Sequence, residues 1–190
     1  MAERKRIIVG MTGASGAILG VRLLALTQPL ADVETHLVVS PAAIRTLGIE
    51  TDLGIDDVRA MADHVHSFTD IGAAIASGSF KTEGMIVAPC SVKTLSGIAT
   101  CMAGDLIGRA ADVCLKERRR VVLLFRETPL HAGHIQLMDQ ATRNGAIVMP
   151  AVVGFYYRPE NVIDIVDHLA GRALDLLGVD TGTVNRWTGE

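Results

Sequence analysis

Continuous apolar runs recur along the chain, each followed by a longer stretch with helical patterning. Runs of Val, Ile and Leu without polar alternation are typical of parallel strands that are buried on both faces. Such strands are predicted at residues 7–11, 35–40, 84–90, 121–126 and 146–150. Helices are predicted between and after them, at residues 16–28, 41–49, 55–64, 91–101, 106–118, 130–144 and 160–177.

This alternation predicts the α/β class: a doubly wound, mostly parallel sheet in a Rossmann-like or flavodoxin-like three-layer sandwich. The chain has 190 residues, which fits one domain. No repeat, low-complexity tract or linker divides it. We therefore expect a single domain over residues 1–190, in which the residues from about 178 onward form a C-terminal arm.

Composition narrows the classes of function. A net charge of −3 and an aromatic content of 4% argue against a nucleic-acid partner, which needs basic patches and stacking rings. The apolar run at 7–9 stops at Gly10, far short of a membrane span or a secretory signal. The cysteines make neither a disulfide framework nor a CxxC motif, and Cys90, without a nearby base, is expected to pack a loop. We expect a cytoplasmic protein with no membrane partner.

The turn after the first predicted strand, GMTGASGA at 10–17, suggests a phosphate ligand. Glycines let backbone N–H groups approach a phosphate, and the N-terminus of the following helix favours negative charge. The spacing G-x-x-G-x-x-G is neither a dinucleotide fingerprint nor a P-loop, and no acidic residue ends the second strand to hold a ribose. We expect Gly13 to bring the backbone close to a ligand and to adopt a positive φ. A tight turn with Ser15 as the helix cap remains the alternative.

Polar residues follow each of the predicted strands. The carboxyl ends of parallel strands meet at one edge of an open sheet, and ligands bind there. The residues expected at this edge are Ser15, Ser40, Ser91, Lys93, Thr94, Arg126, Glu127, Tyr156 and Arg158. Ser40 and Ser91 also suit the N-cap position of a helix, and that simpler role stays open.

The predicted helix at 106–118 carries Arg109, Asp112 and Lys116 on one face, because their spacing is i, i+3, i+7. Asp112 can pair with either cation. The rest of the helix is mostly apolar, so we expect both cations to be largely buried and to need an anionic partner.

The histidines give little sign of a metal site. His131 and His134 are spaced i, i+3 on one predicted helix, but no third ligand follows in a recognisable pattern. His64 and His66 are expected in a loop, and His36 is expected to be a structural or surface residue. No bound metal is expected.

Seven segments, taken in order, resemble the UbiX-type flavin prenyltransferase family. They are GMTGASGA (10–17), ETHLVVS (34–40), SGSF (77–80), PCSVKTLSGIA (89–99), GRAADVCLKERRR (108–120), RETPLHAGHIQLM (126–138) and FYYRP (155–159). The resemblance runs from about residue 6 to residue 187. Gly154, where related sequences often have alanine, and Tyr157 are mild departures that touch no residue assigned to chemistry.

The resemblance implies transfer of a dimethylallyl group from dimethylallyl monophosphate to N5 and C6 of reduced FMN, without a metal. The product, prenylated FMN, would serve UbiD-type decarboxylases, including those of ubiquinone synthesis. The family also implies a homododecamer in which neighbouring subunits complete each site.

The resemblance also assigns residues to roles. It places FMN among Gly13, Ala14, Ser15, Ser40, Ser91, Thr94, Arg109 and Arg126. It places the prenyl phosphate among Lys116, Glu127, Tyr156 and Arg172. It implies that Ser15 and Glu50 form a hydrogen-bonded pair that manages a flavin proton, and that Glu127 carries or relays a proton near the phosphate.

Two other functions share part of this pattern. An FMN-dependent cysteine-type decarboxylase of the same superfamily would have a PASANT-like loop where this chain has PCSVKT, and a catalytic histidine that finds no match here. A non-catalytic flavin carrier would have no use for a second phosphate site such as Lys116, Glu127 and Arg172.

Overall fold

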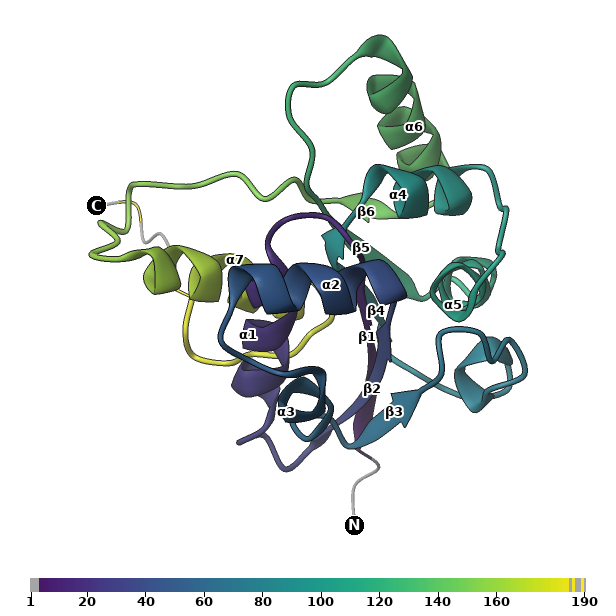
Figure 1. Ribbon diagram of the computed structural model, residues 1–190, viewed down its shortest axis with the longest axis horizontal. Coiled ribbons are helices and arrows are strands. Elements are labelled where there is room, and N and C mark those ends of the chain that lie inside the picture. The colour runs from purple at the N-terminus through teal and green to yellow at the C-terminus, as the bar shows by residue number, and fades with distance from the viewer. Residues whose placement is uncertain (1–3, 185, 187–188, 190) are drawn as a thin grey trace.

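The predicted α/β class is confirmed by a computed structural model, which describes residues 4–184, 186 and 189. Parallel strands form one sheet in the order β3-β2-β1-β4-β5-β6 (Figure 1). The strands are β1 (Lys5–Met11), β2 (Val33–Val39), β3 (His64–His66), β4 (Gly84–Cys90), β5 (Arg120–Phe125) and β6 (Ile147–Val148). The chain builds outward from β1 in one direction and then from β4 in the other. The crevice between the carboxyl ends of β1 and β4 is therefore the switch point at which such folds bind ligands.

Helices cover both faces of this sheet. One face carries α1 (Ala17–Thr27), α2 (Pro41–Glu50), α3 (Ile55–Arg59) and α7 (Val162–Leu176). The other face carries the 3₁₀ helix η1 (Ala74–Ala76), α4 (Val92–Ala99), α5 (Leu106–Lys116) and α6 (Ala132–Arg143). Helix α6 rises beyond the body of the molecule (Figure 1), and Ala141 is its one buried residue. Apart from the helix predicted over 55–64, the predicted helices are found to within about two residues of their ends.

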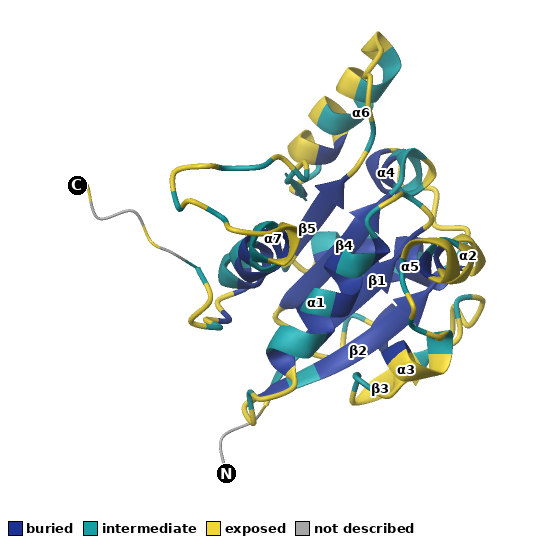
Figure 2. Cartoon of the chain, turned by 60° about the vertical axis from the view of Figure 1, so that its left-hand side comes forward, coloured by how far each residue is buried: buried dark blue, intermediate teal, exposed yellow. Residues whose placement is uncertain are grey.

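The central strands alternate between two apolar clusters. Ile7, Val9 and Met11 of β1 pack with α1 and α7, whereas Ile8 packs with α4 and α5 on the opposite face. All four side chains are at most 1% exposed, and Figure 2 shows the inner strands as one buried layer. A sheet buried on both faces explains why its strands read as continuous apolar runs.

The structure differs from the sequence-based expectation at residues 60–66. The helix predicted over 55–64 ends at Arg59, and His64–His66 form the edge strand β3. This strand has only 3 residues and one apolar side chain, so it shows no period that a sequence pattern could reveal. The position expected to be a loop therefore extends the sheet.

The C-terminal segment follows α7 closely. Val179 is 2% exposed and its N–H donates to Leu174 O. Residues 185, 187, 188 and 190 of the predicted arm lie outside the described residues. Among the residues that the structure describes, no helix is both long and apolar enough to cross a membrane.

Candidate functional site

Thr12 joins the two loops at the switch point. Its hydroxyl donates to Pro89 O at 2.6 Å and accepts from the N–H of Ser91 at 2.9 Å. Thr12 is only 2% exposed, so this link is well shielded from water. Sequence reasoning missed this residue, because a threonine inside a glycine-rich turn has no distinctive signal until the facing loop is known.

Ser15 and Glu50 lie together at the start of α1. Glu50 Oε2 accepts hydrogen bonds from the N–H groups of Gly16, at 2.8 Å, and Ala17, at 2.9 Å. The Ser15 side chain is hydrogen-bonded to the same carboxylate. Gly16, the N-cap of α1, has no side chain to offer, so Glu50 supplies the cap from the end of α2.

The Glu50 carboxylate stays ionised. Partial burial alone would raise its pKa, but hydrogen bonds from Ser15 and the two backbone N–H groups outweigh this effect and lower the pKa. The positive charge of Arg126, in the loop after β5, lowers it further. An ionised Glu50 holds the Ser15 hydroxyl as a donor, which is an arrangement suited to proton transfer.

Gly13 was expected to adopt a positive φ in this turn, but the structure gives Gly13 and Gly16 different roles. Gly16, not Gly13, adopts the left-handed conformation, with φ of 104°. A Cβ on Gly13 would lie 2.4 Å from the Cβ of Ala42, which belongs to the first turn of α2. Gly13 is therefore required by close packing of the turn against α2, and the expectation of a positive φ at this position was wrong.

Ser40, Ser91 and Thr94 lie at the same edge, where Ser40 caps α2 and Ser91 caps α4. Ser40 Oγ accepts from the N–H of Ala43 at 3.1 Å and begins α2. Ser91 Oγ accepts from the N–H of Thr94 at 3.4 Å and lies 3.2 Å from the Thr94 hydroxyl. The simpler capping role is thus present, and it brings two helix N-termini to one edge, where their dipoles favour an anion.

Arg109 and Lys116 are less buried than the apolar pattern of their helix suggested. Arg109 is 39% exposed and pairs with Asp112 at 2.8 Å. Lys116 is 49% exposed and pairs with Glu117 at 2.5 Å, so Asp112 serves only the first cation. The expectation of largely buried cations was wrong, because their helical face lies outside the layer that packs on the sheet.

Tyr156 and Arg172 lie around the ring of His168. The Tyr156 and His168 rings meet edge-on with centroids 6.1 Å apart, and Tyr157 stacks on His168 at 4.1 Å. Burial and the charge of Arg172 both lower the pKa of His168, so this imidazole is neutral. Arg172 itself donates to Asp175 at 2.8 Å.

Lys116 and Glu127, both expected at the prenyl phosphate, do not meet within one chain. Lys116 ends α5 beside the amino end of β5, whereas Glu127 follows the carboxyl end of that strand. The 6 residues of β5 separate the two edges by about 20 Å. Glu127 lies at the carboxyl edge, where its Oε1 accepts from the N–H of Thr128 at 2.9 Å.

Cys90 has no nucleophilic character. It is fully buried at the end of β4, and burial raises the pKa of its thiol to about 12. A thiol that stays protonated at neutral pH cannot attack a substrate. The structure therefore agrees with a packing role for Cys90.

Comparison with known proteins identifies related chains over nearly the whole length. A family model described as Flavoprotein matches residues 1–172. The flavin prenyltransferase UbiX of Thauera aromatica is 52% identical over 184 residues, which are 97% of this chain and 94% of that protein.

Solved structures show the same relationship. The structure of AnUbiX (PadA1) in complex with FMN and dimethylallyl pyrophosphate has a TM-score of 0.96 and 49% identity, and the match covers 99% of this chain and 100% of that one. A dodecameric FMN-dependent UbiX-like decarboxylase from Escherichia coli O157:H7 has a TM-score of 0.94 and 49% identity, with 97% and 100% covered.

Proposed function

This chain belongs to the UbiX-type flavin prenyltransferases of the flavoprotein family, and we propose that it joins a dimethylallyl group to reduced FMN at the carboxyl edge of its sheet. The donor we propose is dimethylallyl monophosphate. The pyrophosphate bound in AnUbiX is the competing donor, and the experiment below separates the two.

The switch point between β1 and β4 suits the phosphate and ring of FMN. The helix starts capped by Ser40 and Ser91 supply backbone N–H groups, and Arg126 supplies a cation near the Ser15–Glu50 pair. Gly13 and Ala14 lie in the turn that joins β1 to α1. Arg109 belongs to α5, whose Ile107 would meet a Cβ placed on Gly10 of β1, so this helix starts next to the same strand. These contacts support the assignment of the flavin-binding residues.

The bound flavin supplies a nucleophilic nitrogen, N5, and later the ring carbon C6. The first bond would join N5 to the CH₂ end of the allyl group as the C–O bond to phosphate breaks and the phosphate leaves with the electron pair. The second bond would join C6 to the other end as the central allyl carbon takes up a proton, and N5 and C6 would each give up one proton. Lys116 and Arg172 offset the charge that grows on this leaving group, and Tyr156 donates a hydrogen bond to it. Glu127 would carry a proton near the phosphate, and Ser15 with Glu50 would accept one of the two protons lost from the flavin.

The observation that carries this proposal is the Ser15–Glu50 pair with Arg126 beside it. An ionised carboxylate and a bound hydroxyl at the flavin edge are groups for proton transfer, which a simple flavin carrier does not need. The cysteine-type decarboxylase is disfavoured because this chain has PCSVKT at residues 89–94 in place of a PASANT-like loop.

A complete site requires more than one chain. Lys116 lies at the opposite edge of the sheet from Glu127, so residues of two or three subunits have to meet. The dodecamer of the UbiX-like protein from Escherichia coli O157:H7 is an assembly in which they could do so. Exposed apolar side chains near the phosphate residues fit such contacts: Val152 is 70% and Phe155 73% exposed. We propose that residues 1–190 form one flavin-binding domain of this assembly. Its product would pass to a UbiD-type decarboxylase in the cytoplasm, where free cysteines such as those of this chain are usual.

The direct test is an anaerobic incubation with reduced FMN and either dimethylallyl monophosphate or dimethylallyl pyrophosphate. Mass analysis of the flavin should show one added dimethylallyl group with the monophosphate. An unchanged flavin with both donors would refute the proposal, and reaction with the pyrophosphate alone would correct the donor.

A second experiment tests whether residues of different subunits form one site. Ser15→Ala and Arg172→Ala proteins, each impaired alone, are unfolded together and reassembled. Hybrid sites should recover part of the wild-type rate if the two residues come from different subunits. A mixture no more active than its components would place both residues in one chain's site.

A further inference from the structure

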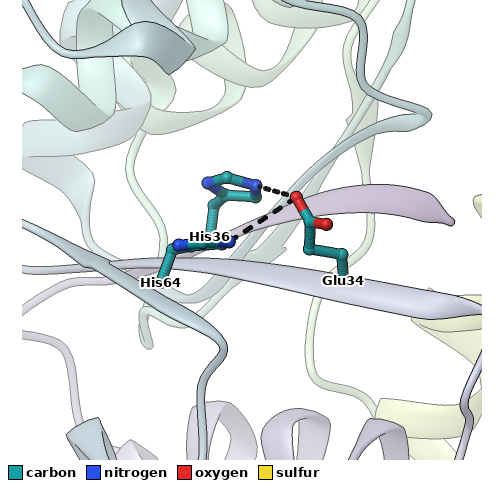
Figure 3. Close-up of side chains that lie close together, drawn as sticks. All are labelled: Glu34, His36 and His64. Carbon is teal, nitrogen blue, oxygen red and sulfur yellow. Dashed lines mark hydrogen bonds and ion pairs between the residues drawn. The ribbon is translucent and has the colours of Figure 1, made fainter.

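Four polar side chains form a cluster on one face of the sheet, outside the candidate functional site. Glu34 and His36 alternate along β2, and His64 and His66 alternate along the edge strand β3. His36 is paired in register with His64. Alternate residues of neighbouring strands point to the same face, and Figure 3 shows Glu34, His36 and His64 turned toward one another.

The ligand-type atoms of this cluster converge. Glu34 Oε1 lies 3.0 Å from His36 Nε2 and 3.7 Å from His64 Nε2. All three atoms lie within 4.8 Å of one another. Tetrahedral zinc with bonds of about 2.0–2.1 Å sets its ligand atoms about 3.3 Å apart, so only small shifts would bring these atoms around one ion. Within the described part of the chain, no other group of three such residues gathers in this way.

The protonation states suit a metal. Burial lowers the pKa of His36, so its imidazole is neutral. Burial acts to raise the pKa of Glu34, but hydrogen bonds from His36 and Arg6 prevail and keep this carboxylate ionised. Neutral imidazole and ionised carboxylate are the forms that bind metals.

The fourth residue can orient the ring of His36. His36 Nδ1 lies 2.9 Å from His66 Nε2. If Nε2 of His36 binds an ion, Nδ1 keeps the proton and donates it to His66, which fixes the tautomer as outer hydrogen bonds do in known metal sites. His66 is neutral because burial lowers its pKa, so it can accept this bond.

We propose that Glu34, His36 and His64 bind a divalent transition-metal ion of the zinc class, with a water molecule as the fourth ligand. Two imidazoles and one carboxylate favour zinc, cobalt or nickel over magnesium or calcium. Arg6 Nε also donates to Glu34 Oε1 at 3.0 Å, so the ion would have to share the carboxylate with this guanidinium or displace it. Arg6 is 27% exposed and lies over the Phe80 ring at 5.1 Å, where it can remain without Glu34.

The proposed ion would fasten the edge of the sheet and would not enter the prenyl transfer. Ser40, at the carboxyl edge, lies six positions beyond Glu34 along the chain, a distance of about 20 Å. Binding to the folded form alone raises stability, and here it would tie the 3-residue strand β3 to β2.

The test uses protein without a histidine tag, titrated with cobalt(II) chloride and then with zinc chloride as competitor. We expect one cobalt ion per chain, visible absorption bands of a four-coordinate site, loss of those bands on adding zinc, and a higher melting temperature with zinc. The His64→Gln variant should bind at least about tenfold more weakly, since even outer partners of a ligand are worth about 10- to 100-fold in affinity. His64 is 53% exposed, so this variant should fold.

The control is His134→Gln, which removes one ring of the other close imidazole pair, His131 and His134, whose centroids are 3.7 Å apart. This variant should bind cobalt as the wild type does. Absence of stoichiometric binding, unchanged binding by His64→Gln, or loss of binding only in His134→Gln would each overturn the proposal. Prenyl transfer by the wild type should be the same with and without a chelator, which keeps this test independent of the proposed function.

Discussion

The two halves of the candidate site differ in how much of them one chain builds. On the flavin side, Ser15, Glu50 and Arg126 already interact, and the loops that hold them are joined through Thr12. On the phosphate side, Lys116 pairs with its neighbour Glu117, and Arg172 pairs with Asp175. The first half is organised by the fold itself, whereas the cations of the second are held by local ion pairs that an incoming phosphate can replace.

The largest effect expected is on the phosphate side. Arg172→Ala and Lys116→Ala should each lower the rate of prenyl transfer by about 100-fold or more, because each removes a charge that stabilises the leaving group. FMN binding should be unchanged. Stopped assays of prenylated flavin, with FMN affinity measured by fluorescence, separate the two. Equal loss of FMN affinity would mean that these cations serve the flavin phosphate.

A proton-transfer defect is expected next, on the flavin side. Ser15→Ala removes one hydroxyl from Glu50 and little volume, so FMN should still bind while the rate falls by about 10- to 100-fold. Following the flavin spectrum after mixing with the donor measures this step. A normal rate would mean that Ser15 has only a structural role in the turn.

Gly13 gives a sharper test of how the flavin half is packed. Gly13→Ala should destabilise the fold by about 1–3 kcal/mol, because its Cβ would overlap that of Ala42. Adding Ala42→Gly should recover most of the lost stability. The Ala42→Gly variant alone measures the cost of a glycine in the helix, which has to be subtracted. Thermal unfolding of the four proteins gives the coupling. Purely additive effects would show that the two residues do not meet.

The pH dependence of stability isolates Glu50. Its pKa in the folded state is below the ordinary value of 4.5, so its contribution to stability is present above that value and is lost as the pH falls through the folded pKa. Glu50→Gln should therefore lower the melting temperature at neutral pH, and the difference from the wild type should shrink as the solution becomes more acidic. A difference that is constant with pH would mean that the charge contributes nothing.

The smallest effect is expected at Cys90. Cys90→Ala should leave prenyl transfer unchanged, since a thiol with a pKa of about 12 takes no part in the reaction at neutral pH. Steady-state assays at several pH values check this. A loss of more than about tenfold in rate would show that Cys90 takes part in the reaction.

Most of the helices and strands could be predicted from the sequence, because strands buried on both faces of the sheet appear as apolar runs. The expected roles of the site residues came from the resemblance to a family. The edge strand at His64–His66 could not, since one short polar strand is specified by its partner β2 rather than by its own pattern. The burial of Arg109 and Lys116 was misjudged because apolar neighbours reveal the inner face of a helix and not how far its outer face is covered. The family resemblance gave the Ser15–Glu50 pair, but the capping of α1 by Glu50 was missed, because it depends on a contact across 34 residues that no local pattern encodes.

That contact has an evolutionary consequence. The Glu50 carboxylate that starts α1 is also the partner of Ser15, so under the proposed proton-transfer role selection would act on this one residue for two reasons. A substitution that tuned the chemistry would also weaken the helix, and a drift that preserved the helix would have to preserve the chemistry. Under that role, this position would resist neutral change even though it lies on the surface, where most positions vary freely.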